Sequence, residues 1–342
     1  MVLRRLFAAD KAASQRRDTR NEASGNGQAV SGADPNARND RGGSGNTRST
    51  DARRGGMITI LSGALAFLGV CALLYPMAAS WVSQYNQSKV IISNLQGENA
   101  ATKAQDSREI ALARAYNSKL STGAATYKAE NNAPTSSADK SLHSLYESAL
   151  GSGSGVMARI QIPAIDLDLP VYHGTDDATL LKGIGHLEGT SMPVGGEGTH
   201  AVLTGHRGLA NATMFTYLNK VKDGDEFTIS TFGDVLTYRV IRTQVVDPDQ
   251  TKSLRPVAGQ DLVTLVTCTP LGINTQRIFV TGQRVYPTPV AAVNDASKRP
   301  TIPRFPWWMA MLFAAIVLDA AYLRISLSPW RQIRHAAWRP KG

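Results

Sequence analysis

A cysteine, a histidine and an arginine each stand at the end of a segment with the composition of a buried β-strand. Cys268 follows the apolar, β-branched run 261–267, and a proline and a glycine stop the strand just after it. His206 follows the run 201–205, and Arg277 begins another strand-like run nine residues after the cysteine. Three such strand ends in one sheet predict a site built around a cysteine nucleophile.

These three side-chain types are sufficient for acyl transfer through a thioester. A free thiol has a pKa of about 8.5 and is mostly protonated at neutral pH, and a nearby positive charge favours the anion. His206 can donate a proton to the departing amine, and the N–H groups of Arg277 can stabilise the oxyanion of a tetrahedral intermediate. We therefore expect catalysis by Cys268 with no metal ion and no cofactor.

Each of the three residues also has a structural interpretation. A histidine after a strand is usually structural, and His173, His186 and His200 are equally available by residue type. An arginine on a strand commonly lies on a solvated face, and a lone cysteine often packs as a small buried hydrophobe. The sequence by itself leaves open whether the three residues converge.

The two cysteines have different expected surroundings. Cys71 lies in a predicted membrane span and Cys268 in the predicted globular part, so we expect no disulfide between them. Extracellular domains generally pair their thiols. A single unpaired thiol in such a domain favours the catalytic interpretation of Cys268.

Length and charge limit the class of protein. The 342 residues carry a formal net charge of +10, and much of the basic surplus lies in the first 56 residues and the last dozen. The surplus therefore marks the tails rather than a nucleic-acid face, and no zinc-finger, helix–turn–helix or aromatic-basic signature is present. Beside the tails and membrane segments, the length leaves room for one globular domain.

Two long apolar segments, 57–82 and 307–327, predict transmembrane helices. Arginines precede the first and follow the second, so the positive-inside rule places both termini in the cytoplasm and residues 83–302 outside the cell. A cleaved signal peptide is the alternative for the first segment, but the long preceding tail favours an uncleaved anchor. Asp319 either extends to the membrane interface, which is the favoured interpretation, or marks a helix–helix contact.

The expected outside part begins with helices and a breaker-rich loop and continues, from Val156 onward, as short strands separated by glycine turns. Two short helices are expected among the strands, at 178–181 and 214–218. Many short strands with such turns predict a closed barrel or a sandwich. The expected domains are a disordered basic tail 1–56, a transmembrane helix 57–82, a helical and lid region 83–155, a catalytic β domain 156–290, a linker 291–306, a second transmembrane helix 307–327 and a basic tail 328–342.

Two motifs carry a resemblance to a known family. Thr204-Gly-His206-Arg-Gly208 and Thr264-Leu-Val-Thr-Cys268-Thr-Pro-Leu-Gly-Ile-Asn-Thr-Gln-Arg277 resemble the active-site signatures of sortases, the membrane-bound transpeptidases of Gram-positive bacteria. The likeness is greatest to class C, the pilus-assembling sortases, because further class C segments occur in the same order. These segments are Ile162-Pro-Ala-Ile165, Leu169-Pro-Val-Tyr-His-Gly174, Gly185-His-Leu-Glu-Gly-Thr190 and Pro193-Val-Gly-Gly196.

This resemblance covers roughly residues 85–290 and implies a mainly β fold, an eight-stranded sortase β-barrel with N-terminal helices, flanked by two transmembrane helices. It implies Cys268 as nucleophile, His206 as general acid and base, and Arg277 as the oxyanion and substrate-positioning group. The implied substrates are pilins or surface proteins with a Leu-Pro-x-Thr-Gly-like C-terminal sorting signal, cut between Thr and Gly. The acyl group would pass to a lysine amine of the next pilin. The other expected partner is the lipid bilayer, and no nucleic-acid partner is expected.

The chain departs from the class C pattern ahead of the barrel. Class C enzymes usually carry a lid there, with an Asp-Pro-aromatic motif in the active site. The corresponding stretch 121–145 contains Pro134 and Asp139 but no such triplet. Two alternatives remain, a lid in which Tyr127 or His143 fills the groove and a site without that contact.

Three functions are compatible with the sequence. A pilin-polymerising sortase is favoured. A sortase that joins single surface proteins to a cell-wall precursor amine uses the same chemistry, but the second span and the pre-barrel loop argue against it. A non-catalytic, membrane-tethered barrel for adhesion or scaffolding is the alternative of another class, and it has no need of Cys268.

Overall fold

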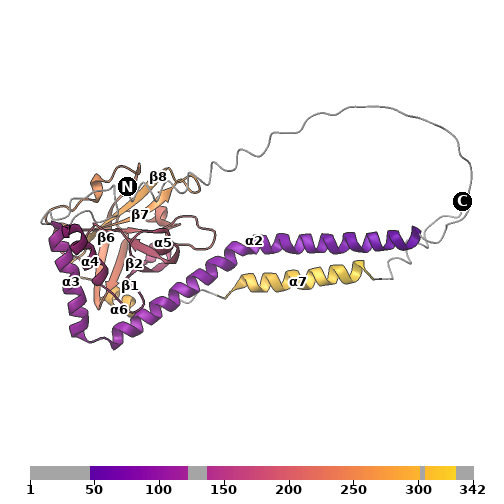
Figure 1. Ribbon diagram of the computed structural model, residues 1–342, viewed down its shortest axis with the longest axis horizontal. Coiled ribbons are helices and arrows are strands. Elements are labelled where there is room, and N and C mark those ends of the chain that lie inside the picture. The colour runs from indigo at the N-terminus through magenta and orange to yellow at the C-terminus, as the bar shows by residue number, and fades with distance from the viewer. Residues whose placement is uncertain (1–46, 122–136, 301–304, 329–342) are drawn as a thin grey trace, which may run out of the picture. The chain divides into compact units, whose positions relative to one another are not determined.

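The computed structural model describes residues 47–121, 137–300 and 305–328. These residues divide into two compact units. The larger unit holds the described residues from Ala79 to 300, and the smaller holds those up to Ala78 and from Phe305 onward. A β-barrel with helices packed on it forms the larger unit, and a pair of helices forms the smaller (Figure 1).

Eight strands close into a barrel in the order β1-β2-β3-β4-β7-β8-β6-β5. Two neighbouring pairs, β2–β3 and β4–β7, are parallel, and the others are antiparallel. This architecture confirms the predicted eight-stranded barrel. The strands are β1 (Val156–Ile162), β2 (Leu167–His173), β3 (Ile184–His186), β4 (Thr199–Thr204), β5 (Glu226–Thr231), β6 (Asp234–Val246), β7 (Asp261–Thr269) and β8 (Gln276–Arg284).

The strands β4, β7 and β8 are apolar on both faces because each face packs against a different cluster. Their inward residues, such as Leu203 and Leu265, belong to the main core inside the barrel. The alternate residues point outward into a second group, here named the outer cluster. The outer cluster consists of Leu187, Val202, Leu254, Val266 and Phe279. Burial on both faces explains why β7 reads as a continuous apolar run rather than an alternating one.

Helices α3 (Lys103–Ser121) and α4 (Ser137–Ser148) pack on the barrel (Figure 1). Tyr116 of α3 and Tyr146 of α4 are fully buried in the main core. The Tyr146 hydroxyl accepts a hydrogen bond from the backbone N–H of Gly174 at 2.8 Å, and the Tyr116 hydroxyl accepts one from the loop after β3 at 3.0 Å. Each helix is therefore fixed to a barrel loop as well as to the core.

Helix α2 (Thr47–Ala100) is longer than the predicted membrane span 57–82. It starts inside the segment 1–56 that was predicted to be disordered, so that boundary is wrong, and residues 1–46 lie outside the described part. Its last turns belong to the larger unit, where Ile91 is buried.

The smaller unit pairs the first part of α2 with α7 (Trp307–Ser326), and both helices are long and apolar enough to cross a membrane. The hydroxyls of Ser62 and Tyr322 lie 3.0 Å apart. A side chain added at Gly63 would begin 2.9 Å from a carboxylate oxygen of Asp319. Asp319 thus faces a helix–helix contact, which was the less favoured of the two interpretations.

The segment predicted as a linker, 291–306, starts as part of a helix, α6 (Val290–Ser297). This helix is attached to the barrel, because the Arg159 guanidinium donates to the carbonyl of Ala296 at 2.8 Å. The same guanidinium pairs with both carboxylate oxygens of Asp168, at 2.7 and 2.6 Å. The linker prediction is therefore wrong for these residues, since they are part of the globular unit.

Three short elements test the remaining local predictions. Helix α5 (Asp177–Lys182) confirms the helix expected at 178–181. The stretch 214–218 forms a turn that leads into the 3₁₀ helix η2 (Leu218–Lys220) rather than an α-helix. Strand β3 was not predicted, because three residues are too few to show an alternating pattern. The other 3₁₀ helices are η1 (Pro163–Ile165) and η3 (Lys252–Leu254).

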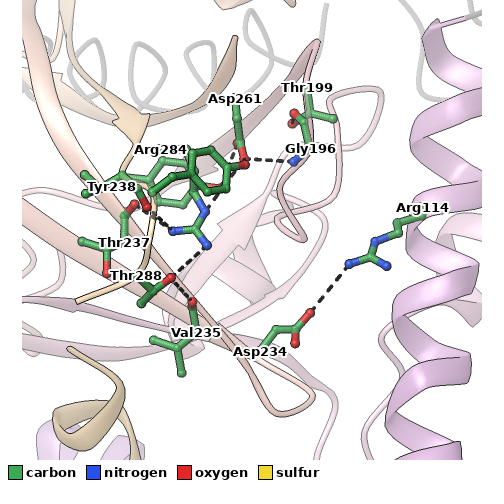
Figure 2. A network of polar contacts seen from close by, with 12 residues as sticks. Arg114, Gly196, Thr199, Asp234, Val235, Thr237, Tyr238, Asp261, Arg284 and Thr288 are labelled. Atoms are coloured by element: carbon green, nitrogen blue, oxygen red, sulfur yellow. Dashed lines mark hydrogen bonds and ion pairs between the residues drawn. The ribbon is translucent and has the colours of Figure 1, made fainter. Parts of the chain in front are cut away.

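A buried polar cluster closes the end of the barrel at which β7 begins (Figure 2). The Asp261 carboxylate accepts hydrogen bonds from the Gly196 N–H at 2.9 Å and the Tyr238 hydroxyl at 3.1 Å. The Arg284 guanidinium lies 4.0 Å from the same carboxylate. Cys268 lies at the other end of β7, so this cluster stabilises the barrel away from the candidate site.

Candidate active site

Cys268 and Arg277 are held next to each other by the pairing of β7 with β8. The two residues are directly opposite in this antiparallel pair. Opposite residues have Cβ atoms about 4.5–5.5 Å apart and point to the same face of the sheet. The thiol and the guanidinium therefore start from neighbouring positions on one face, although a turn separates them in the sequence.

His206 reaches the same level from the other neighbour of β7. The parallel pairing of β4 with β7 is extended by Gly205, whose N–H donates to the carbonyl of Val266 at 3.0 Å. The Thr267 hydroxyl donates to the carbonyl of Gly205 at 2.8 Å. Continuing this register brings His206 level with Cys268. The cysteine thus stands between the histidine and the arginine on three adjacent strand ends.

Strand alternation assigns Cys268 and Arg277 to the outer face of the barrel. Each is two residues from a member of the outer cluster on its own strand, and His206 follows the end of β4 beside them. Cys268 and His206 are partly exposed, whereas Arg277 is 1% exposed. The candidate site therefore opens outside the barrel, at the carboxyl ends of β4 and β7.

The guanidinium of Arg277 is fixed by the turn that precedes it. One terminal nitrogen donates to the carbonyls of Asn274 and Gln276, at 2.7 and 2.6 Å. The planar group consequently has a defined orientation beside Cys268. A buried positive charge at this position favours the thiolate form of a neighbouring cysteine and can stabilise a developing oxyanion.

The three rival histidines have structural roles. The rings of His173, His186 and His200 each lie within hydrogen-bond distance of a backbone carbonyl, at 2.8, 2.8 and 3.0 Å. Burial lowers the pKa of His186 to about 4 and also lowers the pKa values of His173 and His200, so these rings are neutral at physiological pH. Within the described residues, no three His, Cys, Asp or Glu side chains form a group that could hold a metal ion.

Sequence reasoning missed Arg207 and Thr269, which also lie at the site. The Arg207 guanidinium donates to the Thr269 hydroxyl at 2.9 Å, and these two residues directly follow His206 and Cys268. The only available signal was their position inside the two motifs, because neither residue type indicates this contact by itself.

The predicted lid falls partly outside the described residues. The candidate lid residues outside the described part are Tyr127, Pro134 and the side chain of Asp139. His143, in α4, is described, and its Nδ1 lies 2.7 Å from a carboxylate oxygen of Glu188. Glu188 raises the pKa of His143, mainly through this hydrogen bond. His143 is therefore engaged with Glu188 rather than with Cys268.

Comparisons with known proteins agree with the barrel fold. Residues 160–285 match the sortase domain family. The crystal structure of sortase C1 from Streptococcus agalactiae is similar at 37% identity and a TM-score of 0.53, over 58% of this chain and 98% of that one. Sortase C-1 from Actinomyces oris is 46% identical over 53% of this chain and 98% of that one, with a TM-score of 0.48.

Sortase D of Bacillus subtilis is 31% identical over 138 residues, which are 40% of this chain and 65% of that protein. The matched region thus spans a little under two thirds of this curated relative. The match to the Streptococcus agalactiae structure, in contrast, includes nearly all of that chain at 37% identity and agrees in fold. With 37% identity over nearly all of that solved sortase, together with the sortase-domain match, the chain belongs to the sortase family.

Proposed function

We propose that this protein is a membrane-anchored cysteine transpeptidase that cuts a Leu-Pro-x-Thr-Gly-like sorting signal between Thr and Gly. The observation that carries the proposal is that Cys268 lies on β7 between its two neighbouring strands, with Arg277 opposite it on β8 and His206 just beyond the end of β4. A nucleophile with a proton carrier on one side and a fixed cation on the other, each one strand away, provides the groups that acyl transfer requires.

In the first step, the Cys268 thiolate attacks the carbonyl carbon of the threonine. A carbon–sulfur bond forms, and the negative charge on the carbonyl oxygen is stabilised by the N–H groups of Arg277. When the tetrahedral intermediate collapses, the bond to the glycine nitrogen breaks and His206 gives that nitrogen a proton. The products are a thioester on Cys268 and a free amino-terminal glycine.

In the second step, an acceptor amine attacks the thioester. His206 takes a proton from the amine, a carbon–nitrogen bond forms, and the carbon–sulfur bond breaks to restore the thiolate. The new amide is equivalent in energy to the one that was cut, so the exchange needs no external energy source. Retaining the thioester between the two steps conserves the energy of the broken peptide bond.

The acceptor in this proposal is a lysine amine of the next pilin subunit. The similarity to sortase C1 of Streptococcus agalactiae and the two candidate membrane helices support this class C assignment. Attachment of single surface proteins to a cell-wall precursor amine is the second candidate, because it uses the same site. Covalent protein ladders on a denaturing gel would indicate pilin joining, and single-protein anchoring would give no ladder.

The proposed location is the cell membrane, with both termini in the cytoplasm and the barrel outside. The two apolar helices and the arginines at their flanks support this orientation. Substrates that are themselves membrane-anchored would share a thin layer with the barrel. Confinement raises the effective concentration of the two partners without new contacts between them.

The test is a comparison of two cysteine substitutions in the full-length protein. We expect Cys268→Ala to abolish the acyl adduct that mass spectrometry detects after mixing the enzyme with a sorting-signal peptide. Cys71→Ala is the matched control, because Cys71 belongs to the smaller unit, on a candidate membrane helix, and it should leave the adduct intact. If Cys268→Ala retains peptide cleavage, the non-catalytic barrel is the better explanation.

A further inference from the structure

Two of the three proposed catalytic residues are fixed by the sheet, and the third is not. Cys268 and Arg277 are opposite each other within β7 and β8. His206 lies two residues beyond Thr204, the last residue of β4, where the chain leaves the sheet. Backbone pairing alone therefore does not determine where the imidazole lies relative to the thiol.

The segment after β4 is held by hydrogen bonds from three directions. Gly205 bonds to β7 through its N–H, and the carbonyl of His206 accepts from the N–H of Phe215 at 2.9 Å. The N–H of Gly208 donates to the Thr216 hydroxyl at 3.1 Å. These bonds fix the backbone of the turn, and the Thr267 hydroxyl, which donates to the carbonyl of Gly205 at 2.8 Å, joins the turn to the residue before Cys268.

The side chain of Arg207 makes a second connection, to the residue after Cys268. One terminal nitrogen donates to the Thr269 hydroxyl at 2.9 Å and lies 3.5 Å from the carbonyl oxygen of Cys268. The Nε atom donates to the carbonyl of Thr216 at 3.2 Å. One guanidinium thus joins the histidine turn, the end of β7 and the segment around Thr216.

We propose that Arg207 is a positioning residue that sets the distance between His206 and Cys268. The bond from Arg207 to Thr269 joins the residue after the histidine to the residue after the cysteine, so the two backbone segments cannot move apart without breaking it. The guanidinium also places a second positive charge at the backbone of Cys268, 3.5 Å from its carbonyl oxygen. This inference rests on the proposed transpeptidase function and adds a fourth residue to its site.

An arginine is required here because the contacts diverge. The Nε and terminal nitrogens point in different directions within one plane and serve acceptors on two separate segments. A lysine ammonium carries the charge but is a single compact donor group on a flexible stem. Arg207→Lys should therefore preserve the charge and lose the bridge.

The experiment uses the full-length protein in lipid nanodiscs and a soluble sorting-signal peptide. We expect Arg207→Gln to lower kcat about tenfold or more with little change in KM, because a displacement of about 1 Å in a catalytic group can cost that much. Arg207→Lys should lose nearly as much as Arg207→Gln. Arg239→Gln is the matched control. Arg239 lies on the half of β6 distant from Arg277 and pairs with exposed Glu226 of β5, so this variant should keep wild-type kcat.

The partner residue gives an independent measurement that does not alter the arginine. Thr269→Val removes the hydroxyl at nearly constant shape and should lower kcat, whereas Thr269→Ser keeps the hydroxyl and should stay near wild type. The double variant Arg207→Gln/Thr269→Val should be no slower than Arg207→Gln, because Thr269→Val removes only a bond that Arg207→Gln has already removed. Fully additive losses would contradict the proposed bridge.

A pH profile separates positioning from general destabilisation. We expect the apparent pKa for alkylation of Cys268 by iodoacetamide to shift upward in Arg207→Gln, since a purely structural loss would leave it unchanged. If the wild-type protein forms no acyl adduct, the proposed function fails. If the adduct forms and Arg207→Gln and Thr269→Val both keep wild-type kcat, only the positioning role is overturned.

Discussion

At the scale of single residues, the site depends on how a positive charge is presented to Cys268. Arg277 is buried and fixed by two carbonyls of its own turn, so its charge cannot be screened by water or move away. A charge in such surroundings interacts more strongly with a thiolate or an oxyanion than an exposed one does. The orientation of the guanidinium is therefore as important as its charge.

Replacement of Arg277 by lysine tests this point. An ammonium on a flexible stem cannot reproduce two parallel donors in a fixed plane. We expect Arg277→Lys to lower kcat by about 10²-fold, the usual effect of removing an oxyanion donor. The measurement is steady-state cleavage of a sorting-signal peptide, with circular dichroism to verify folding, and near-normal turnover would contradict the oxyanion role.

At the scale of elements, aromatic and imidazole rings from α4, β2 and β3 pack together in one cluster. Tyr146 of α4 packs on His186 of β3, with ring centroids 5.6 Å apart, and its hydroxyl donates to the carbonyl of the same residue at 3.1 Å. His173 of β2 packs edge-on against Tyr146 at 5.0 Å. The cluster attaches α4, which begins inside the predicted lid stretch 121–145, to β2 and β3.

This cluster predicts a loss of stability in acid. The pKa of buried His186 is about 4, below its usual value, so between about pH 6.5 and 4 the unfolded chain binds a proton that the folded chain does not. Stability is therefore complete above pH 6.5 and falls as the pH drops through that window, by up to roughly 3 kcal/mol from this group. Thermal unfolding temperatures recorded from pH 7.5 to pH 4 measure this loss of stability.

His143 contributes with the opposite sign. Glu188 raises the pKa of His143, so its protonated form is favoured in the fold and this small contribution is lost as the pH rises. The side chain is about half exposed, so solvent screening keeps the effect small. His186→Gln should flatten the decline of stability below pH 6.5, whereas His143→Gln should not. A decline in His186→Gln as steep as in the wild-type protein would contradict the assignment of the acid sensitivity to His186.

At the scale of the whole molecule, two membrane helices would confine the barrel to a surface. Helices α2 and α7 approach each other at Gly63, where the absence of a side chain leaves space for the carboxylate of Asp319. A close approach at a glycine and a hydrogen bond between hydroxyls are the usual means by which helices associate in lipid. The second helix thus has a defined partner within the same chain.

Crosslinking tests this helix pair. Cysteines introduced as Ser62→Cys and Tyr322→Cys, in a chain with Cys71→Ala and Cys268→Ala, should be joined by a bifunctional maleimide, since the native hydroxyls are 3.0 Å apart. A crosslinker is needed because cysteine is much shorter than tyrosine and leaves a gap that a direct disulfide does not span. Adding Gly63→Leu should reduce the yield several-fold because a side chain there would meet Asp319. Gly69→Leu is the control, since nothing lies within 4 Å of its added Cβ, and equal yields in the two variants would contradict the pairing.

Local sequence patterns were a good guide to most elements of the barrel. The run Val156–Ile162 matches β1 in both bounds, and the stretch predicted before Cys268 matches the buried part of β7. Alternation and β-branched composition act over a few neighbouring residues, so they are visible in the chain itself. Strand β3 and helix α6 were missed because one is very short and the other has no strong apolar period.

By itself, the sequence determined the chemistry that is available: one thiol in the globular part, an arginine nine residues later, two long apolar spans and a family resemblance. Tertiary structure brings His206 to the end of a strand paired with β7, level with Cys268, while the rings of His173, His186 and His200 bond to backbone carbonyls. It also brings Arg207 to Thr269 and Asp319 to Gly63. These outcomes depend on contacts between residues far apart in the chain, and such contacts arise only when strand register and helix packing bring those residues together.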